Sequence, residues 1–314
     1  MRINYNIREQ VDIGRVGGHE TFTPRYGWLK KGYDAAKKDP FVFNTPDAIE
    51  RLGVGKNMVR SIRFWCLAFH LLEYLSGQEQ KGQHGGLQPT LLGDKLLDDD
   101  GWDPFLEDVA SLWLLHWQLF IPPFHAASWP VCFNHVLLPY FEPKHLSSAL
   151  IAATQNYEKL RKLSQGSFEK DGSCIIRMYV PASDNTAFGI ESPFSMLGIM
   201  RKAEEANSFR FEIGEKQTLP EDIFAAACLS YAQNVQAETQ RTLSLHRICF
   251  DYNSPGVAFK VSETEAGRYL DQAARSHEDI DFVESMGYQQ LQFTRDAREL
   301  YWQLLEVHYG SSLR

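Results

Sequence analysis

Two helical segments joined by a glycine-containing turn constrain the fold of this chain more than any other feature. The first, PDAIERLG, follows Thr45, which can cap a helix, and starts with Pro46, which suits a first helical position. The turn VGKN leads into a second segment, 57–75, in which apolar residues recur at helical spacing. A short helix, a tight turn and a longer helix together predict a helix-turn-helix.

The second helix begins with side chains suited to reading DNA. Lys56, Asn57, Arg60 and Arg63 stand at or near its N-terminal end. Arg and Asn match the guanine and adenine edges in the major groove. The glycine-rich loop that follows the helix, and the extended segment after it, are typical of the wing of a winged helix. The alternative is an ordinary helical hairpin whose cations are solvated.

Positive charge is concentrated in the first fifth of the chain. Residues 1–63 hold 12 Lys and Arg against 7 Asp and Glu, a net charge of +5, whereas the whole chain carries −8. The remaining residues therefore carry −13. A basic segment on an acidic body predicts a phosphate-binding surface in the basic segment. A solvated surface of mixed charge is the alternative.

The rest of the chain predicts a mainly helical, α+β protein, because helical patterns are broken by short strands without regular βαβ alternation. Helices are expected over 107–124, 147–165, 192–206, 219–235 and 262–274, and strands over 174–180, 209–213 and 282–293.

We expect three domains. A winged-helix DNA-binding domain would occupy residues 1–100 and a central helical domain residues 101–165. A C-terminal α+β domain with winged-helix-like elements would occupy 166–314, with a linker beginning at Gly166.

Several classes of protein are excluded by motifs that the sequence lacks. No apolar run approaches the roughly 20 residues of a membrane span, and the N-terminus lacks the pattern of a secretory signal. The five cysteines form no C-x-x-C pair, which favours reduced thiols and a cytoplasmic protein. Walker A, dinucleotide-binding and zinc-protease motifs are absent, so no nucleotide cofactor is expected.

Two further features are interpreted as structural. His116 lies in the strongly apolar segment 107–124 and is expected to be a hydrogen-bonded core histidine rather than a metal ligand. The acidic run from Asp98 to Asp100 is interpreted as a solvated turn, with a metal site as the alternative.

The stretch GGHETFTPRYGWLKKGY near the N-terminus is open to three interpretations. In the first, its aromatic residues pack the following helix onto the helix-turn-helix, and His19 or Glu20 bonds a backbone amide. In the second, Arg25, Lys30 and Lys31 contact DNA phosphates, and Arg25 engages two phosphate oxygens at once. In the third, His19 is a general base or metal ligand, Glu20 is a metal ligand, and Arg25 stabilises charge in the transition state.

The same stretch resembles the N-terminal signature of the SspB-type proteins of bacterial DNA phosphorothioation defence systems, the DUF4007 family. Four later stretches resemble the family in the same order, so the resemblance spans nearly the whole chain. They are TPDAIERLGVGKNMVRSIRFW, LWLLHWQLF, SPFSMLGIM with LPEDIF, and SPGVAFKV. The first of these four and the N-terminal stretch are the specific ones.

The resemblance implies a role beside a sulfur-inserting machine of phage defence. SspB-type proteins are taken to nick double-stranded DNA, so that sulfur can replace a non-bridging phosphate oxygen near the break. Nicking by an endonuclease of this kind would use Mg²⁺ or Mn²⁺. The implied partners are a cysteine desulfurase, an ATPase and a protein resembling phosphoadenylylsulfate reductases.

Two other functions remain open at this point. The chain could be a non-enzymatic DNA-binding adaptor or regulator that recruits the sulfur-transfer partners. It could also be a protein-interaction scaffold that does not bind DNA.

Overall fold

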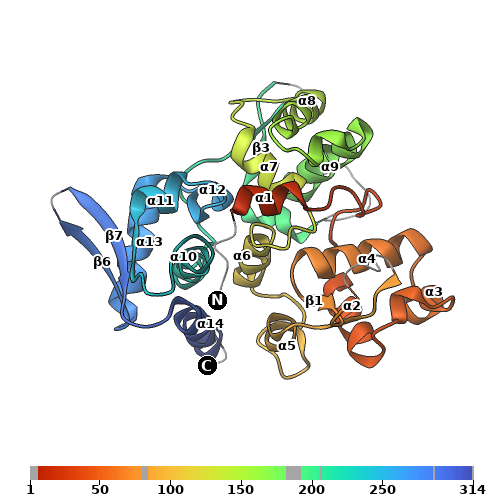
Figure 1. Ribbon diagram of the computed structural model, residues 1–314, viewed down its shortest axis with the longest axis horizontal. Coiled ribbons are helices and arrows are strands. Elements are labelled where there is room, and N and C mark those ends of the chain that lie inside the picture. The colour runs from red at the N-terminus through yellow and green to blue at the C-terminus, as the bar shows by residue number, and fades with distance from the viewer. Residues whose placement is uncertain (1–5, 79–83, 182–191, 206, 286, 313–314) are drawn as a thin grey trace.

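Helices make up most of the described chain, and its strands pair in small antiparallel sheets (Figure 1). The expected mainly helical α+β class is therefore confirmed. None of the described helices is long and apolar enough to cross a bilayer. The computed structural model describes residues 6–78, 84–181, 192–205, 207–285 and 287–312.

The N-terminal part contains the predicted pair of helices. Gly53 ends the first of them with a left-handed φ of 63°, a conformation that glycine adopts without the steric cost of a Cβ atom. The two strands of this part pair antiparallel. Its elements are α1 (Ile7–Asp12), α2 (Trp28–Lys38), η1 (Val42–Asn44), α3 (Ala48–Leu52), α4 (Lys56–Ala68), β1 (Leu72–Tyr74), β2 (Leu87–Pro89) and α5 (Leu91–Leu97).

The second helix of the pair, α4, is shorter than predicted. It ends at Ala68 instead of continuing to residue 75, and His70 takes a left-handed φ of 54° before the chain enters β1. In β1 the side chains alternate between buried and exposed, which fits a strand better than a helix. The apolar residues between Phe69 and Leu75 are compatible with helical spacing and with the alternation of a strand. The structure has the strand, which pairs with β2.

The central part is built around α6. Its side chains are buried on every face from Ala110 to Gln118, as the apolar sequence predicts. Figure 1 places α6 between the N-terminal helices and the C-terminal helix α10 (Glu221–Val235). The expected core histidine is confirmed, because His116 bonds Tyr179 Oη and a backbone carbonyl at 2.7 and 2.9 Å. The central elements are α6 (Val109–Gln118), α7 (Ser128–His135), α8 (Pro143–Thr154), η3 (Leu160–Lys162) and α9 (Gln165–Tyr179).

Two predictions for the central part are wrong. The segment 174–180, expected as a strand, lies almost entirely in α9, and Gly166, expected to begin a linker, lies in the same helix. The β-branched and aromatic residues of segment 174–180 favour a strand by composition. In the structure Phe168, Ile175 and Tyr179 are instead buried at helical spacing on one face of α9. Packing of α9 against α8 therefore overrides the local preference.

The C-terminal part combines two helices in the expected places, α10 (Glu221–Val235) and α13 (Glu263–Ser276), with two small sheets. The helix predicted over 192–206 is wrong, because the 3-10 turn η4 stops at Gly198 (φ 61°) and a strand follows. Ser262 caps α13 as predicted, since its side chain accepts a hydrogen bond from Glu265 N. The elements are η4 (Pro193–Leu197), β3 (Met200–Lys202), β4 (Phe209–Phe211), α10, β5 (Thr242–Ser244), α11 (Leu245–Phe250), α12 (Pro255–Phe259), α13 (Glu263–Ser276), β6 (Ile280–Ser285), β7 (Tyr288–Phe293) and α14 (Ala297–Ser312). β3 pairs with β4, and β7 lies between β5 and β6.

Buried side chains from all three predicted domains belong to one hydrophobic cluster. Its largest fully buried members include Trp65, Trp113, Trp117 and Trp129. The division of the chain into three domains stays a prediction.

Two buried lysines lie in the C-terminal part. Lys260 Nζ donates to Phe133 O at 2.6 Å and lies over the rings of Phe133 and Phe211, and Lys216 Nζ donates to Glu212 O at 2.6 Å. Burial lowers the pKa of both ammonium groups to about 8. A lysine without a carboxylate partner destabilises the folded state while it is charged.

The first prediction concerns Lys260. Between pH 8 and the unfolded lysine value of about 10.4, the unfolded chain binds more protons at this group than the folded chain, so its contribution to stability rises with pH. We expect Lys260→Met to be more stable than the wild type at pH 7, and this advantage to shrink by roughly 2 kcal/mol by pH 10. Urea denaturation of both proteins across this range measures the difference.

Comparison with the variant isolates Lys260 from the buried cysteines, whose thiol pKa is raised by burial and which act in the opposite direction. A difference between the two proteins that stays constant with pH would contradict the prediction.

Candidate nucleic-acid interface

The loop between α1 and α2, residues 17–27, has an uncommon backbone; we call it the N-terminal loop. Gly17, Gly18, Glu20 and Thr21 have positive φ angles of 73°, 95°, 50° and 66°. Such angles are rare outside glycine and unfavourable for a β-branched residue such as Thr. Strain of this kind persists only where surrounding contacts hold the backbone, and it is frequent in ligand-binding segments.

Asp171 in α9 holds the start of the N-terminal loop. Its Oδ1 lies 2.8 Å from His19 Nε2, and its Oδ2 accepts hydrogen bonds from Gly17 N at 3.1 Å and Ser128 Oγ at 2.6 Å. His19 and Asp171 are each only 1% exposed. Because a carboxylate accepts hydrogen bonds, the Nε2 of His19 carries a proton. One buried carboxylate thus ties the loop to α7 and α9.

Aromatic rings enclose His19 on several sides. Its ring stacks on Trp65 and meets Phe64 and Trp129 edge to face, with centroids 5.8 to 6.3 Å apart. Trp65 Nε1 also donates to Phe22 O at 3.0 Å, which fixes the loop over α4. A general base has to reach its substrate, so this enclosure favours the structural interpretation of His19. A catalytic role for His19 stays a prediction.

The far end of the N-terminal loop faces solvent. Arg25 is exposed, and its guanidinium lies 5.5 and 5.3 Å from the ring centroids of Phe22 and Trp28. Arg177 donates to Thr21 O at 2.6 Å and so fixes the middle of the loop. Stacking uses the face of the Arg25 guanidinium and leaves its in-plane N–H groups for other acceptors, such as phosphate oxygens.

The N-terminal end of α4 presents polar side chains beside this loop. Lys56, Asn57 and Arg60 are exposed, as the helical spacing predicts. Arg60 forms a surface ion pair with Glu20 of the loop, 3.4 Å between Nη1 and Oε1. Gly55 supplies no side-chain cap, so the first amides of α4 are left for other acceptors. An uncapped helix N-terminus flanked by cations favours phosphate binding.

Arg63 does not belong to this exposed set. It is 7% exposed, its guanidinium lies 5.3 Å from the ring centroid of Tyr74, and its Nη2 donates to Gly85 O at 3.5 Å. The side chain of Arg63 thus extends from α4 to Tyr74 of β1 and to the segment before β2. In this arrangement the base contact predicted for Arg63 is unavailable, because the side chain is covered.

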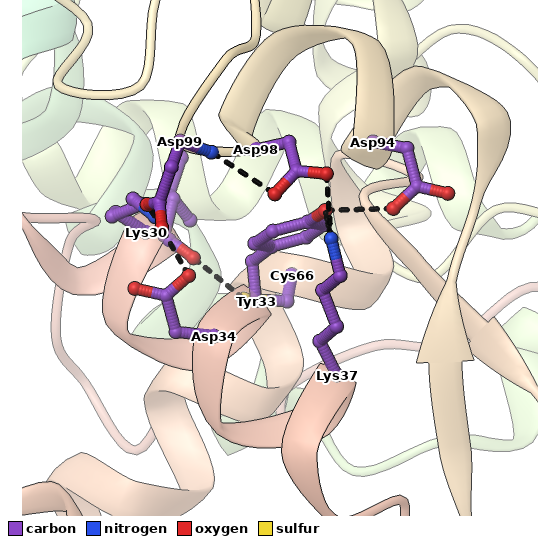
Figure 2. Close-up of polar contacts among 9 residues, drawn as sticks. Lys30, Tyr33, Asp34, Lys37, Cys66, Asp94, Asp98 and Asp99 are labelled. Atoms are coloured by element: carbon purple, nitrogen blue, oxygen red, sulfur yellow. Dashed lines mark hydrogen bonds and ion pairs between the residues drawn. The ribbon is translucent and has the colours of Figure 1, made fainter.

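Carboxylates neutralise two lysines of α2 (Figure 2). Lys30 Nζ lies 2.7 Å from both Asp34 Oδ1 and Asp99 Oδ1, and its side chain is 11% exposed. Lys37 Nζ lies 2.6 Å from Asp98 Oδ2. The acidic run expected as a solvated turn therefore pairs with α2. The phosphate contact predicted for Lys30 would require its two carboxylates to be displaced.

Tyr33 and Lys31 complete the contacts of α2. Tyr33 Oη donates to Asp94 Oδ1 at 2.7 Å, and burial raises the pKa of this phenol. Lys31 stays exposed while its Nζ donates to Leu52 O, at the C-terminal end of α3, at 2.9 Å. A cation at that end also favours the helix dipole. Of the two predicted lysines of α2, Lys31 is the one open to a phosphate.

Across the described ranges, no group of three or more His, Cys, Asp or Glu side chains is arranged to hold a metal ion. The acids nearest the predicted site are engaged: Glu20 with Arg60, and Asp171 with His19. The dependence of nicking on Mg²⁺ or Mn²⁺ stays a prediction.

Sequence patterns do not point to Asp171 or Ser128. Asp171 is separated from His19 by 152 residues and lies in a segment whose composition favours a linker followed by a strand. No short motif connects the two positions. Asp171 lies on the buried face of α9 with Phe168 and Ile175. This position can be recognised only once the segment is known to be a helix.

The chain is similar to proteins of known structure over almost its full length. Residues 16–309 match the family model described as "Protein of unknown function (DUF4007)". A structure described as "SspB crystal structure" is 34% identical, with 96% of this chain and 90% of that chain covered and a TM-score of 0.85. A "Magnesium ion-bound SspB crystal structure" has the same identity and coverage and a TM-score of 0.86. No curated protein matches the chain.

The second prediction tests the buried carboxylate. Asp171→Ala leaves Gly17 N, Ser128 Oγ and His19 Nε2 without their shared acceptor, and we expect a loss of about 3 to 5 kcal/mol in the free energy of unfolding. Urea denaturation followed by tryptophan fluorescence measures this loss.

Glu20→Ala is the control, since it removes only an exposed ion pair and should cost about 0.5 kcal/mol or less. Equal losses in the two variants would show that Asp171 has no special role.

Proposed function

Because this chain belongs to the DUF4007 family of SspB-type proteins, we propose that it is the DNA-binding component of a DNA phosphorothioation defence system. Family membership rests on the match over residues 16–309 and on the two SspB structures. What the site itself contributes is a group of exposed cationic and polar side chains on α2, α4 and the N-terminal loop.

The observation that carries the proposal is the exposed end of α4 beside the N-terminal loop. Lys56, Asn57 and Arg60 project from the helix, and Arg25 lies on the loop that Asp171 holds in place. We propose that these four, together with Lys31, contact the DNA backbone and base edges. Arg can bind phosphate or guanine with two hydrogen bonds, and Asn can bind adenine in the same way.

We further propose a winged-helix arrangement for this part. α3 and α4 would be the helix-turn-helix, and the β1–β2 hairpin would be the wing, placed directly after the recognition helix. In this arrangement Arg63, which lies against Tyr74 of β1, would position the wing on α4 instead of reading bases. The acidic remainder of the chain would face the sulfur-transfer partners, namely the desulfurase, the ATPase and the reductase-like protein.

Two versions of the function are supported by different observations. A nicking endonuclease is implied by the family, with Arg25 stabilising charge on the phosphate and Glu20 nearby. A non-enzymatic adaptor is favoured by the burial of His19, whose Nε2 is engaged by Asp171. Both versions require the same DNA-binding surface.

The third prediction tests that surface. The double variant Lys56→Ala, Arg60→Ala should bind a labelled duplex more weakly, and the log–log salt dependence of its binding constant should be less steep by about 2, because two phosphate contacts are lost. Fluorescence anisotropy at several salt concentrations measures both quantities.

A matched control removes two lysines elsewhere. Lys144 and Lys162 are 72% and 65% exposed, and the double variant Lys144→Ala, Lys162→Ala should leave the affinity and its salt dependence unchanged. Equal weakening in both double variants would mean that net charge, and not this surface, governs binding. Unchanged binding in the first would overturn the proposed interface.

The fourth prediction separates the nickase from the adaptor. Supercoiled plasmid is incubated with the protein and Mg²⁺ or Mn²⁺, and open-circle product is measured. Arg25→Met and Glu20→Gln change exposed or half-buried side chains, so both variants should fold. For a nickase we expect about 10²-fold slower conversion by Arg25→Met, as for the loss of one charge-stabilising donor. Tight binding without any conversion by the wild type would establish the adaptor.

A further inference from the structure

A cavity of about 380 Å³ lies where the segment after α1 meets the loop after α6 and strand β1. Two backbone hydrogen bonds join the first two of these segments. Arg15 N donates to Phe124 O at 2.8 Å, and Ala127 N donates to Arg15 O at 2.7 Å. Gly14 permits this approach, because a Cβ atom there would lie 2.8 Å from Ala127 Cβ. The backbone thus brings together Arg15 and His125, which both line the cavity.

The guanidinium of Arg15 is held in place without being neutralised. Its Nη1 donates to Tyr74 Oη at 2.7 Å, and its Cζ lies 5.4 Å from the centroid of the Tyr74 ring. Within the described part of the chain these are the contacts of the guanidinium, so no carboxylate there pairs with it. The side chain is exposed. Its Nε and Nη2 therefore form an open edge, and such an edge binds an oxyanion with two parallel hydrogen bonds.

His125 supplies a second donor to the same cavity. Its side chain is half-buried and makes no hydrogen bond to the described residues. Neither ring nitrogen belongs to the fully buried, unpartnered atoms, so both keep some contact with solvent. Burial lowers the pKa of His125 to about 3, and His70, Arg15 and Arg63 act in the same direction. The ring is therefore neutral near pH 7, and one nitrogen carries a proton that can be donated.

Positive charge prevails around Tyr74, which also lines the cavity. The guanidinium of Arg63 lies 5.3 Å from the centroid of its ring, so two arginines share this ring. One carboxylate, that of Glu73, lines the cavity as well. Glu73 is exposed between the buried Leu72 and Tyr74, so its side chain leaves the opposite face of β1. Its Oε1 accepts a hydrogen bond from Gln88 Nε2 at 3.0 Å.

We propose that this cavity binds a tetrahedral oxyanion, either free or as the phosphate group of a small molecule. Arg15 holds two oxygens through Nε and Nη2, and His125 donates to a third. A cavity of about 940 Å³ adjoins this one and shares Gln10, His70 and Pro123 with it. The rest of a phosphate ester therefore has room beside the bound group.

Binding is measured on the full chain with sulfate and inorganic phosphate at constant ionic strength, with chloride as the reference ion. The ring resonances of His125, assigned with the variant His125→Gln, report binding at the site itself. We expect these resonances to shift saturably at millimolar concentration, and the melting temperature to rise, because the oxyanion binds the folded state.

The two sources of the oxyanion are separated by AMP and adenosine, which differ by the phosphate. If the ligand is an ester, AMP should bind more tightly than inorganic phosphate and at least about tenfold more tightly than adenosine. If the ligand is the free ion, inorganic phosphate or sulfate should bind more tightly than AMP.

The variant Arg15→Met tests the arginine edge. Because Arg15 is exposed, the variant should fold, and its affinity for phosphate should fall by at least about tenfold. Arg15→Lys keeps the charge but lacks the two-pronged edge, so its affinity should lie between the two. Arg8→Met is the matched control. Arg8 is also exposed and lies 5.0 Å from the centroid of an aromatic ring, that of Tyr252, but it does not line the cavity. This variant should bind phosphate as the wild type does.

Failure of this proposal is distinguishable from failure of the DNA-binding proposal. Leu67, which lines the cavity, lies 11 residues along α4 from Lys56, or about 16 Å. The double variant Lys56→Ala, Arg60→Ala should therefore keep its full affinity for phosphate, and Arg15→Met should bind a labelled duplex as the wild type does.

Three results would overturn the proposed site. The first is that sulfate, phosphate and AMP all fail to bind at millimolar concentration. The second is an equal loss of phosphate affinity in Arg15→Met and Arg8→Met, which would mean that net charge governs binding. The third is weaker duplex binding by Arg15→Met, which would assign this arginine to the DNA interface.

Discussion

The position of the N-terminal loop depends on one buried carboxylate. Asp171 of α9 accepts hydrogen bonds from Gly17 N and His19 of the loop and from Ser128 of α7, so three segments of the chain meet at this carboxylate. Residues with positive φ are costly by themselves. The loop can hold several of them because this carboxylate and the ring of Trp65 fix it from two sides. The exposed position of Arg25 over α2, and the contact of Glu20 with α4, follow from that anchoring.

Charge counted along the sequence differs from charge available at the surface. The first 63 residues carry a net +5, which predicts a basic surface. Lys30 and Lys37 are neutralised by Asp98 and Asp99, which lie outside that segment and which no local count includes. Arg51 is paired within the segment, with Asp39. Fewer cations are therefore free of carboxylates than the net charge of the segment suggests, and Arg60 of α4 is also paired, with Glu20 of the N-terminal loop.

The sequence predicted a helix correctly where the residues at its N-terminal end and the spacing of its apolar residues both indicated one. α10 and α13 lie where their caps and spacing place them, and Lys56, Asn57 and Arg60 are exposed as helical spacing requires. Predictions failed where packing decides. Periodicity assumes that a helix has one solvent face, but α4 is buried all round from Ser61 onward, so Arg63 has no such face. The strand predicted within α9 failed for a related reason, since propensity carries no information on neighbouring elements. The role of Asp171 was not predictable, because it depends on three segments meeting.

The two ends of α4 differ in their surroundings. Its N-terminal end is polar, uncapped by a side chain and flanked by the strained N-terminal loop. Its C-terminal end is enclosed, and two residues beyond it His70 takes a left-handed conformation at the edge of the cavity. From Ser61 to Ala68 every residue of α4 is buried, and a close-packed core leaves little room for local adjustment of this part of the helix. The packing of these residues therefore fixes the position of the exposed N-terminal end of the helix, where Lys56, Asn57 and Arg60 lie.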